Sequence, residues 1–188
     1  MTHESKGLRG AGFGGQIFSY EPLPDAFERL ALTSSRDPRW HAERLAVGAR
    51  EGVVYVRETA DSRFSSIRSA VGSGAAFGSA VDVIGTVSAP ITTLDKLSAG
   101  LRDGGIGIKL DVQGFEEEVL KGGVEALRCA AFLEIELSLV PVYEGQSLYM
   151  EMLQWLSGRG FRLVHVQNVW QVEATGESLQ LNGLFVRN

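Results

Sequence analysis

The sequence predicts an α/β fold built on a doubly wound sheet that is mostly parallel and has an antiparallel last strand. Two patterns support this prediction. Apolar runs of strand length alternate with segments of helical periodicity, as in sheets that helices cover. The last two apolar runs, residues 161–166 and 181–186, are joined by a polar turn instead of a helix, which is typical of an antiparallel pair.

Residues 1–15 are polar and then rich in glycine, and they are predicted to form an N-terminal tail or loop. Residues 16–188 are then expected to form a single domain, which is long enough to bury one sizeable core. The expected strands are short runs of apolar, β-branched or aromatic residues at 16–20, 44–47, 53–56, 106–112, 131–137, 161–166 and 181–186.

Helices are expected between several of these strands. Prolines end the first strand, and Asp25 can cap a helix after it. Apolar positions at helical spacing predict a helix over residues 115–127 and another over residues 148–156. Residues 57–90 are rich in Ser, Gly and Ala, so we expect a long excursion with at most one helix, near residues 64–71.

Composition narrows the class of protein and its partners. With 44% hydrophobic and 22% charged residues the chain is an ordinary globular protein. Its net charge of −5 argues against nucleic acid or an anionic membrane as a partner. The single cysteine, Cys129, excludes an intramolecular disulfide and fits a reducing compartment. The start lacks the apolar core of a signal peptide and no apolar run has the ~20 residues of a membrane span, so we expect a cytoplasmic protein.

Glu21 is the first candidate site residue, because it ends the first predicted strand. In a doubly wound sheet, ligands bind beyond the carboxyl ends of the strands, and an acid at such an end takes the ribose hydroxyls of an adenosine cofactor. The alternative is a solvated acid before a turn. Position alone leaves both interpretations open.

Five more charged residues interrupt or follow buried strands. Lys109 and Asp111 share one face of a strand, so they belong either to a site or to an ion pair at the rim of the sheet. Glu116 lies in the first turn of a helix, where the helix dipole favours an acid without any function. Glu134 and Glu136 alternate with an apolar residue, and Glu136 is the better site candidate because it is nearer the carboxyl end.

The sequence gives no sign of a metal centre. His3, His41 and His165 are far apart and have no ligand spacing, so a His-based metal site is not expected. The sequence also has no phosphate-binding loop of the P-loop type and no nucleophile elbow.

A series of segments in the same order resembles the FkbM-type methyltransferases. The two longest are FSYEPLPDAFERL at residues 18–30 and KLDVQGFEEEVLKG at residues 109–122, and the second is similar to the most specific motif of the family. Shorter matching segments lie at residues 46–52, 62–67, 93–95, 134–143 and 182–186. The resemblance covers the chain from about residue 16 onwards.

The resemblance implies a Rossmann-like methyltransferase fold and S-adenosylmethionine as cofactor. It also implies methyl transfer to an oxygen of a small-molecule or saccharide acceptor, such as a sugar, glycolipid or natural product. Glu21 and Pro22 would bind the cofactor at its ribose. The acceptor side would be lined by Lys109, Asp111, Glu116 and Glu136, with Asp111 or Lys109 nearest the hydroxyl that is methylated.

The family pattern begins with a strand and a glycine-rich loop that have no counterpart before Glu21, so we expect an N-terminally truncated domain whose first strand is missing. The glycines of residues 10–15 precede a strand, whereas a cofactor loop follows one, and we interpret them as a turn. The missing strand would leave two interior strand edges unpaired. Either these strands pair directly, or the N-terminal segment or another chain fills the gap, and the last case would make a homo-oligomer.

Two other functions remain as alternatives to an active methyltransferase. The first is a truncated, non-catalytic methyltransferase-like domain that acts as a binding or interaction module. The second is an unrelated dinucleotide-binding protein, which the absence of a G-x-G-x-x-G motif after a strand disfavours.

Overall fold

The structure is a computed structural model that describes residues 7–71, 78–101 and 105–188. Its strands are β1 (Ile17–Tyr20), β2 (Trp40–Glu43), β3 (Ala46–Gly48), β4 (Gly52–Thr59), β5 (Val83–Thr93), β6 (Ile106–Leu110), β7 (Ala130–Ser138), β8 (Phe161–Gln171) and β9 (Ser178–Arg187). Its α-helices are α2 (Pro24–Ser34), α3 (Leu94–Leu97), α4 (Glu116–Lys121), α5 (Val124–Cys129) and α6 (Tyr149–Ser157). No helix in the described part of the chain is long and apolar enough to cross a membrane.

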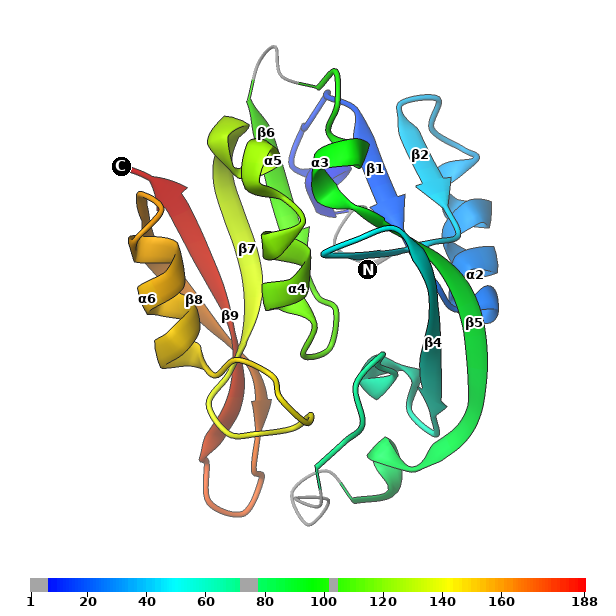
Figure 1. The fold of residues 1–188 in the computed structure, drawn as a ribbon, viewed down its shortest axis with the longest axis vertical. Coiled ribbons are helices and arrows are strands. Elements are labelled where there is room, and N and C mark those ends of the chain that lie inside the picture. Colours follow the sequence, from blue (N-terminus) through cyan, green and yellow to red (C-terminus); the bar gives the residue numbers. More distant parts are fainter. Residues whose placement is uncertain (1–6, 72–77, 102–104) are drawn as a thin grey trace.

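The strands form three separate sheets, with the orders β1-β2, β3-β5-β4 and β6-β7-β9-β8. The pairs β1–β2, β3–β5 and β6–β7 are parallel, and β4–β5, β7–β9 and β8–β9 are antiparallel. The α/β class is therefore confirmed, and so is the antiparallel last strand. The expected single, mostly parallel sheet is not what forms: the strands divide into three sheets, two of which contain antiparallel pairs (Figure 1).

The largest difference from the prediction lies in residues 57–90. Instead of a loop with a helix, β4 and β5 form a long antiparallel pair, with short 3-10 turns at Ser62–Phe64 and Gly78–Val81 between them. The small residues of this segment and Pro90 are not typical of a strand, so the sequence did not predict β5. Proline is tolerated there because the pairing of β5 with β3 begins only at Ile91, so Pro90 needs no hydrogen bond on that side.

Smaller differences concern helix boundaries. The predicted helix over residues 115–127 is divided into α4 and α5 at Gly122, where a Cβ atom would lie 2.1 Å from the carbonyl oxygen of Gly48. The first helix begins at Pro24, so Asp25 lies in its first turn and is not its cap. The sequence also gave no indication of β2, and residues 7–10 of the tail are helical.

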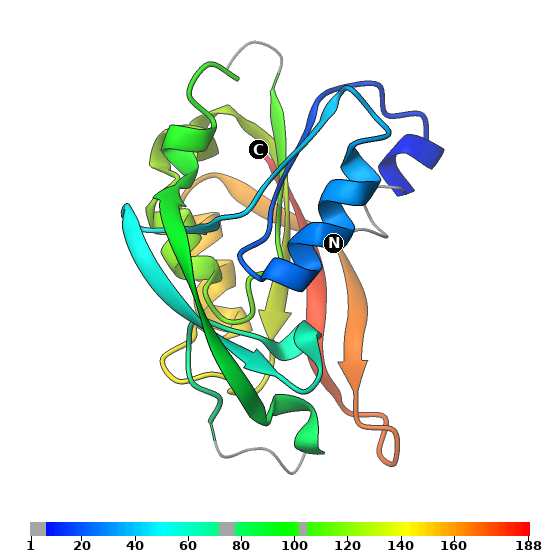
Figure 2. The same cartoon turned by 90° about the vertical axis from the view of Figure 1, so that its right-hand side faces the viewer.

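The main core lies between the four-stranded sheet and α4, α5 and α6. One face of β7 contributes Leu133, Ile135 and Leu137 to it, and all three are buried. The side view places these helices on one side of the sheet (Figure 2). Because neighbouring strand residues point to opposite faces, Glu134 and Glu136 lie on the other face of β7, away from this core.

β1 and β6 each have one edge that stays unpaired among the described residues. β1 pairs only with β2, and β6 pairs only with β7. Direct pairing of β1 with β6, one of the outcomes expected from the sequence, therefore does not occur. Their carboxyl ends nevertheless contribute to the same cavity.

Candidate functional site

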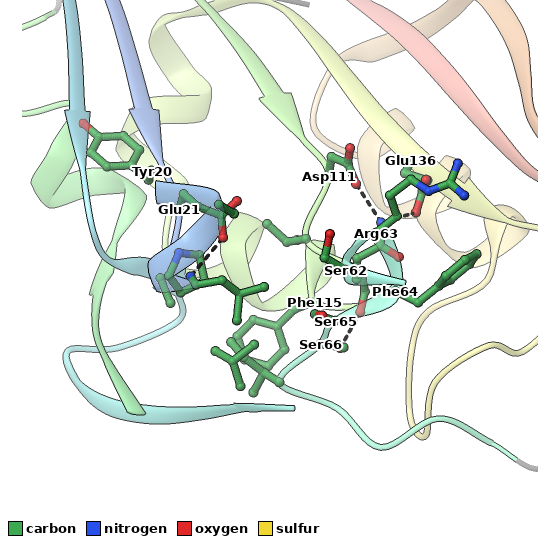
Figure 3. A pocket seen from close by; sticks show the side chains of 18 of the residues that line it. Tyr20, Glu21, Ser62, Arg63, Phe64, Ser65, Ser66, Asp111, Phe115 and Glu136 are labelled. Atoms are coloured by element: carbon green, nitrogen blue, oxygen red, sulfur yellow. Dashed lines mark hydrogen bonds between the residues drawn. The ribbon is translucent and has the colours of Figure 1, made fainter. Parts of the chain in front are cut away.

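A cavity of about 350 Å³ lies at the carboxyl ends of β1 and β6. Its wall also includes residues of β3, of the segment 62–67, and of β8 and β9. Figure 3 shows Glu21 on one side of the cavity and Asp111 and Glu136 on the other. Acids that are far apart in the sequence thus face one space, in the place where α/β sheets bind ligands.

Glu21 follows β1 in a turn that its neighbours fix. The N–H of Leu23, between two prolines that have no N–H to donate, donates to Oε1 of Glu21 at 3.0 Å. Burial raises the pKa of the Glu21 carboxyl; the hydrogen bond from Leu23 acts against this rise, and the negative charge of Asp111 adds to it. Glu21 and Pro22 both line the cavity, so the structure places the two predicted cofactor-binding residues in one wall.

Asp111 and Glu136 form a pair of carboxyl groups on the opposite side. Lys109 of β6 is in register with Glu134 of the parallel strand β7, so the residues two positions further along come side by side. The Nε2 atom of Gln113 donates to Oδ1 of Asp111 at 2.7 Å and to Oε2 of Glu136 at 3.2 Å. Asp111 and Glu136 both line the cavity.

Glu136 is the more buried of the two, with 9% of its surface exposed. Burial, then the charges of Asp111 and Glu116, raise the pKa of Glu136 to about 8. Its Oε2 atom also accepts a hydrogen bond from Nε2 of Gln180 at 2.9 Å. The buried site therefore favours the protonated form of Glu136.

Lys109 and Glu116 do not belong to the cavity wall that the described residues form. Nζ of Lys109 forms an ion pair with Oε1 of Glu134 at 2.6 Å. Glu116 is buried, and its Oε1 atom accepts from the backbone N–H groups of Val112 at 3.2 Å and Gly114 at 3.3 Å. It thereby holds the turn that follows β6. A catalytic role for either residue stays a prediction.

The two buried glutamates give a prediction about pH. Burial raises the pKa of Glu116 to about 7 and that of Glu136 to about 8, from 4.5 in an exposed glutamate. Between pH 4.5 and 8 the folded protein holds protons that the unfolded chain has released, so its stability falls as pH rises through this window. We expect the melting temperature to be at least about 5 °C lower at pH 8.5 than at pH 5.5.

The matched control for this prediction is a pair of Glu→Gln variants. Glu136→Gln mimics the protonated acid and should reduce the pH dependence of the melting temperature, whereas Glu28→Gln, at an exposed position of α2, should leave it unchanged. Equal pH dependence in the two variants would show that Glu136 does not keep its proton in the folded protein.

Several cavity residues were not predicted as site residues. Gln113, Trp170 and Gln180 all line the cavity, and the hydroxyl of Tyr143 lies 2.9 Å from both the backbone oxygen of Phe64 and Oε1 of Gln113. The ring of Phe64 packs edge-on against Trp170, with centroids 5.0 Å apart. The one available signal was Gln180, a polar residue between Leu179 and Leu181.

The glycine-rich tail has another role in the structure. Arg9 donates to the carbonyl oxygens of Phe13 at 2.6 Å and Gly15 at 2.8 Å, and Arg39 donates to that of Gly14 at 2.8 Å. None of residues 7–15 lines the cavity. These contacts agree with the interpretation of this stretch as a turn.

The described residues contain no group of three or more His, Cys, Asp or Glu side chains arranged to hold a metal ion. The polar groups of the cavity are carboxyl, amide and hydroxyl groups, together with the guanidinium groups of Arg29 and Arg63 at the wall. This set suits a polar organic ligand that offers hydrogen-bond donors to carboxylates.

The fold and the cavity define an α/β protein with a polar cavity beyond the carboxyl ends of its strands. Residues 7–163 match the family model of the methyltransferase FkbM domain, and the chain belongs to this family. Comparison with curated proteins and with solved structures gave no match. The family makes the chain a methyltransferase in general terms.

Proposed function

We propose that the protein transfers a methyl group from S-adenosylmethionine to a hydroxyl oxygen of a sugar, glycolipid or natural product. The observation that carries this proposal is the position of Glu21 and Asp111 in one cavity, although they follow different strands. A cofactor site and an acceptor site must adjoin for methyl transfer, because the reacting atoms have to be held in line.

The Glu21 side of the cavity fits the adenosine part of the cofactor. A carboxylate at the end of a strand accepts hydrogen bonds from ribose hydroxyls, and the N–H of Leu23 fixes the orientation of this one. Leu45 and Val47 line the cavity as well and offer apolar surface for the adenine ring of the cofactor. When bound, the cofactor supplies a methyl group on a positively charged sulfur.

The Asp111 side provides the groups that an alcohol acceptor needs. Asp111 is half-buried and lines the cavity, so it can accept a hydrogen bond from the acceptor hydroxyl and then take its proton as the new carbon–oxygen bond forms. The indole ring of Trp170 offers an apolar surface against which a sugar ring can pack. Burial and the neighbouring acids raise the pKa of Glu136 and so disfavour its ionised form, which makes Asp111 the candidate base of the pair.

We expect this 188-residue chain to bind S-adenosylmethionine weakly or undetectably in calorimetry. The described residues contribute Glu21 and Pro22 to the cofactor side, and none of residues 7–15 approaches the cavity to contact the methionine end. Micromolar affinity would contradict this prediction and would mean that the glycine-rich tail moves to complete the site.

The proposed function is tested by transfer of a labelled methyl group. The protein is incubated with millimolar methyl-labelled S-adenosylmethionine and a panel of saccharides, glycolipids and hydroxylated natural products. We expect label in an acceptor that bears a free hydroxyl and none in the same acceptor with that hydroxyl blocked. Label on nitrogen or carbon would contradict O-methylation, and its absence from every acceptor class would contradict the proposal.

A further inference from the structure

The turn between β6 and α4 contains a strained residue. Gln113 has a φ of 52°, in the left-handed region, and it is the one residue other than glycine with a positive φ in the described part of the chain. Residues with a side chain avoid this region, and they persist there only where the surrounding contacts fix them. Glu116 supplies such contacts, because it accepts from the backbone N–H groups on both sides of Gln113.

The side chain of Gln113 lies between the two carboxyl groups of the cavity. Its Nε2 atom reaches Asp111 at 2.7 Å and Glu136 at 3.2 Å, and its Oε1 atom lies 2.9 Å from the hydroxyl of Tyr143. The carboxyl oxygens accept, which places the amide nitrogen at that end, and the Tyr143 hydroxyl shares its one hydrogen between the amide oxygen and the backbone oxygen of Phe64. Both amide hydrogens and the amide oxygen are therefore used.

The backbone of Gln113 also contacts the cavity-lining segment 62–67. Oγ of Ser66 donates to the backbone oxygen of Gln113 at 2.6 Å, and the Tyr143 hydroxyl also lies 2.9 Å from the backbone oxygen of Phe64. Phe64 and Ser66 belong to the cavity-lining segment 62–67. Gln113 thus contacts both the two carboxyl groups and the segment 62–67.

We propose that Gln113 is a positioning residue. Its amide bridges Asp111 and Glu136 and thereby sets the orientation of Asp111, the acid that takes the proton from the acceptor hydroxyl. The proposal rests on the function proposed above. An amide that donates to both carboxyl groups holds them side by side and restricts the rotation of each. No other residue with a described contact donates to both, since Gln180 reaches Glu136 alone.

The charged and titratable groups around Glu136 decide what a substitution should do. They are Asp111 and Lys109 from the β6 side, Glu116 from α4, and Tyr143 from the segment after β7. Hydrogen bonds from Gln113 favour the ionised form of Glu136 and so lower its pKa. Removing this donor should therefore move the titration of Glu136 to higher pH.

The test compares Gln113→Leu with Gln180→Leu as a matched control, since each removes one amide donor from Glu136. The carboxyl carbons of ¹³C-labelled Asp and Glu are titrated by NMR without cofactor or acceptor, with Asp111→Asn and Glu136→Gln used for assignment. We expect Gln113→Leu to shift the Asp111 resonance and to raise the Glu136 midpoint by about one pH unit. Gln180→Leu should raise the Glu136 midpoint and leave the Asp111 resonance in place.

The proposal is overturned if Gln113→Leu lowers the melting temperature but leaves both resonances and the Glu136 midpoint unchanged, because Gln113 would then only complete a turn. It is also overturned if the two Leu variants shift Asp111 equally. Should Gln113→Leu not fold, Gln113→Asn replaces it, because Asn tolerates a positive φ and its shorter amide cannot bridge both acids. The same shift of Glu136 is expected there.

The NMR arm separates this proposal from the proposed function. The NMR titration observes the carboxyl groups directly, so its result does not depend on whether methyl transfer is detected. Where methyl transfer is measurable, Gln113→Leu should lower kcat by about 10–100-fold and leave the KM for S-adenosylmethionine unchanged, because Glu21 is not disturbed. An unchanged kcat beside shifted resonances would overturn the positioning role.

Discussion

Asp111→Asn should lower the rate of methyl transfer by about 10²–10⁴-fold, the usual loss when a positioned general base is removed. Asparagine has the shape of aspartate, and its side-chain oxygen can still accept from Nε2 of Gln113, which lies 2.7 Å from Oδ1 of Asp111. What it loses is the ability to take a proton. We therefore expect turnover to collapse while the melting temperature changes by only a few degrees.

The matched control is Glu134→Gln, which breaks the ion pair with Lys109 outside the cavity. That pair is partly exposed, with 25% and 36% of the two side-chain surfaces accessible, and such pairs contribute only about 0–1 kcal/mol. Turnover should stay near the wild-type rate in this variant. Normal turnover in Asp111→Asn, or unfolding in place of inactivation, would assign Asp111 to structure and make Glu136 the better candidate for the base.

Gly122→Ala should destabilise the fold by about 3 kcal/mol, which corresponds to a drop of about 6–12 °C in melting temperature. A Cβ atom at this position would lie 2.1 Å from the backbone oxygen of Gly48, so no change of side-chain rotamer can relieve the contact. The φ of Gly122 is −84°, which any residue adopts, so the cost arises from this contact and not from backbone strain. The junction of α4 and α5 would have to move away from β3.

Gly158→Ala provides the control, measured by the same thermal unfolding. Gly158 also follows a helix with a negative φ, −62°, and the nearest atoms to its Cβ position lie at 3.5 Å, an ordinary contact distance. This variant should unfold within about 2 °C of the wild type. Similar stability of the two variants would contradict the close packing of Gly122 against Gly48.

The sequence predicts the strands that build the site because those strands are apolar and bounded by clear turns. Residues 16–20, 106–112 and 131–137 correspond to β1, β6 and β7, and the positions of Glu21, Asp111 and Glu136 near strand ends follow from them. The resemblance to the FkbM family rests on the same segments. The match to the family model confirms it.

Other features depend on contacts between distant residues, which a single sequence does not display. β5 pairs along its length with β4, yet its small residues resemble a loop. The division into α4 and α5 depends on how closely Gly122 approaches Gly48. The bridge made by Gln113 requires a left-handed backbone at this residue. The sequence does not predict this conformation, because glutamine rarely adopts it.

In the proposed function, cofactor and acceptor meet in the cavity between Glu21 and Asp111. The most direct measurement is a crystal structure of the protein soaked with millimolar S-adenosylhomocysteine, the demethylated form of the cofactor. We predict ribose hydroxyls within hydrogen-bonding distance of the Glu21 carboxylate and a sulfur atom that faces the side of the cavity where Asp111 lies. A ligand bound outside this cavity, or one whose ribose does not contact Glu21, would contradict the account.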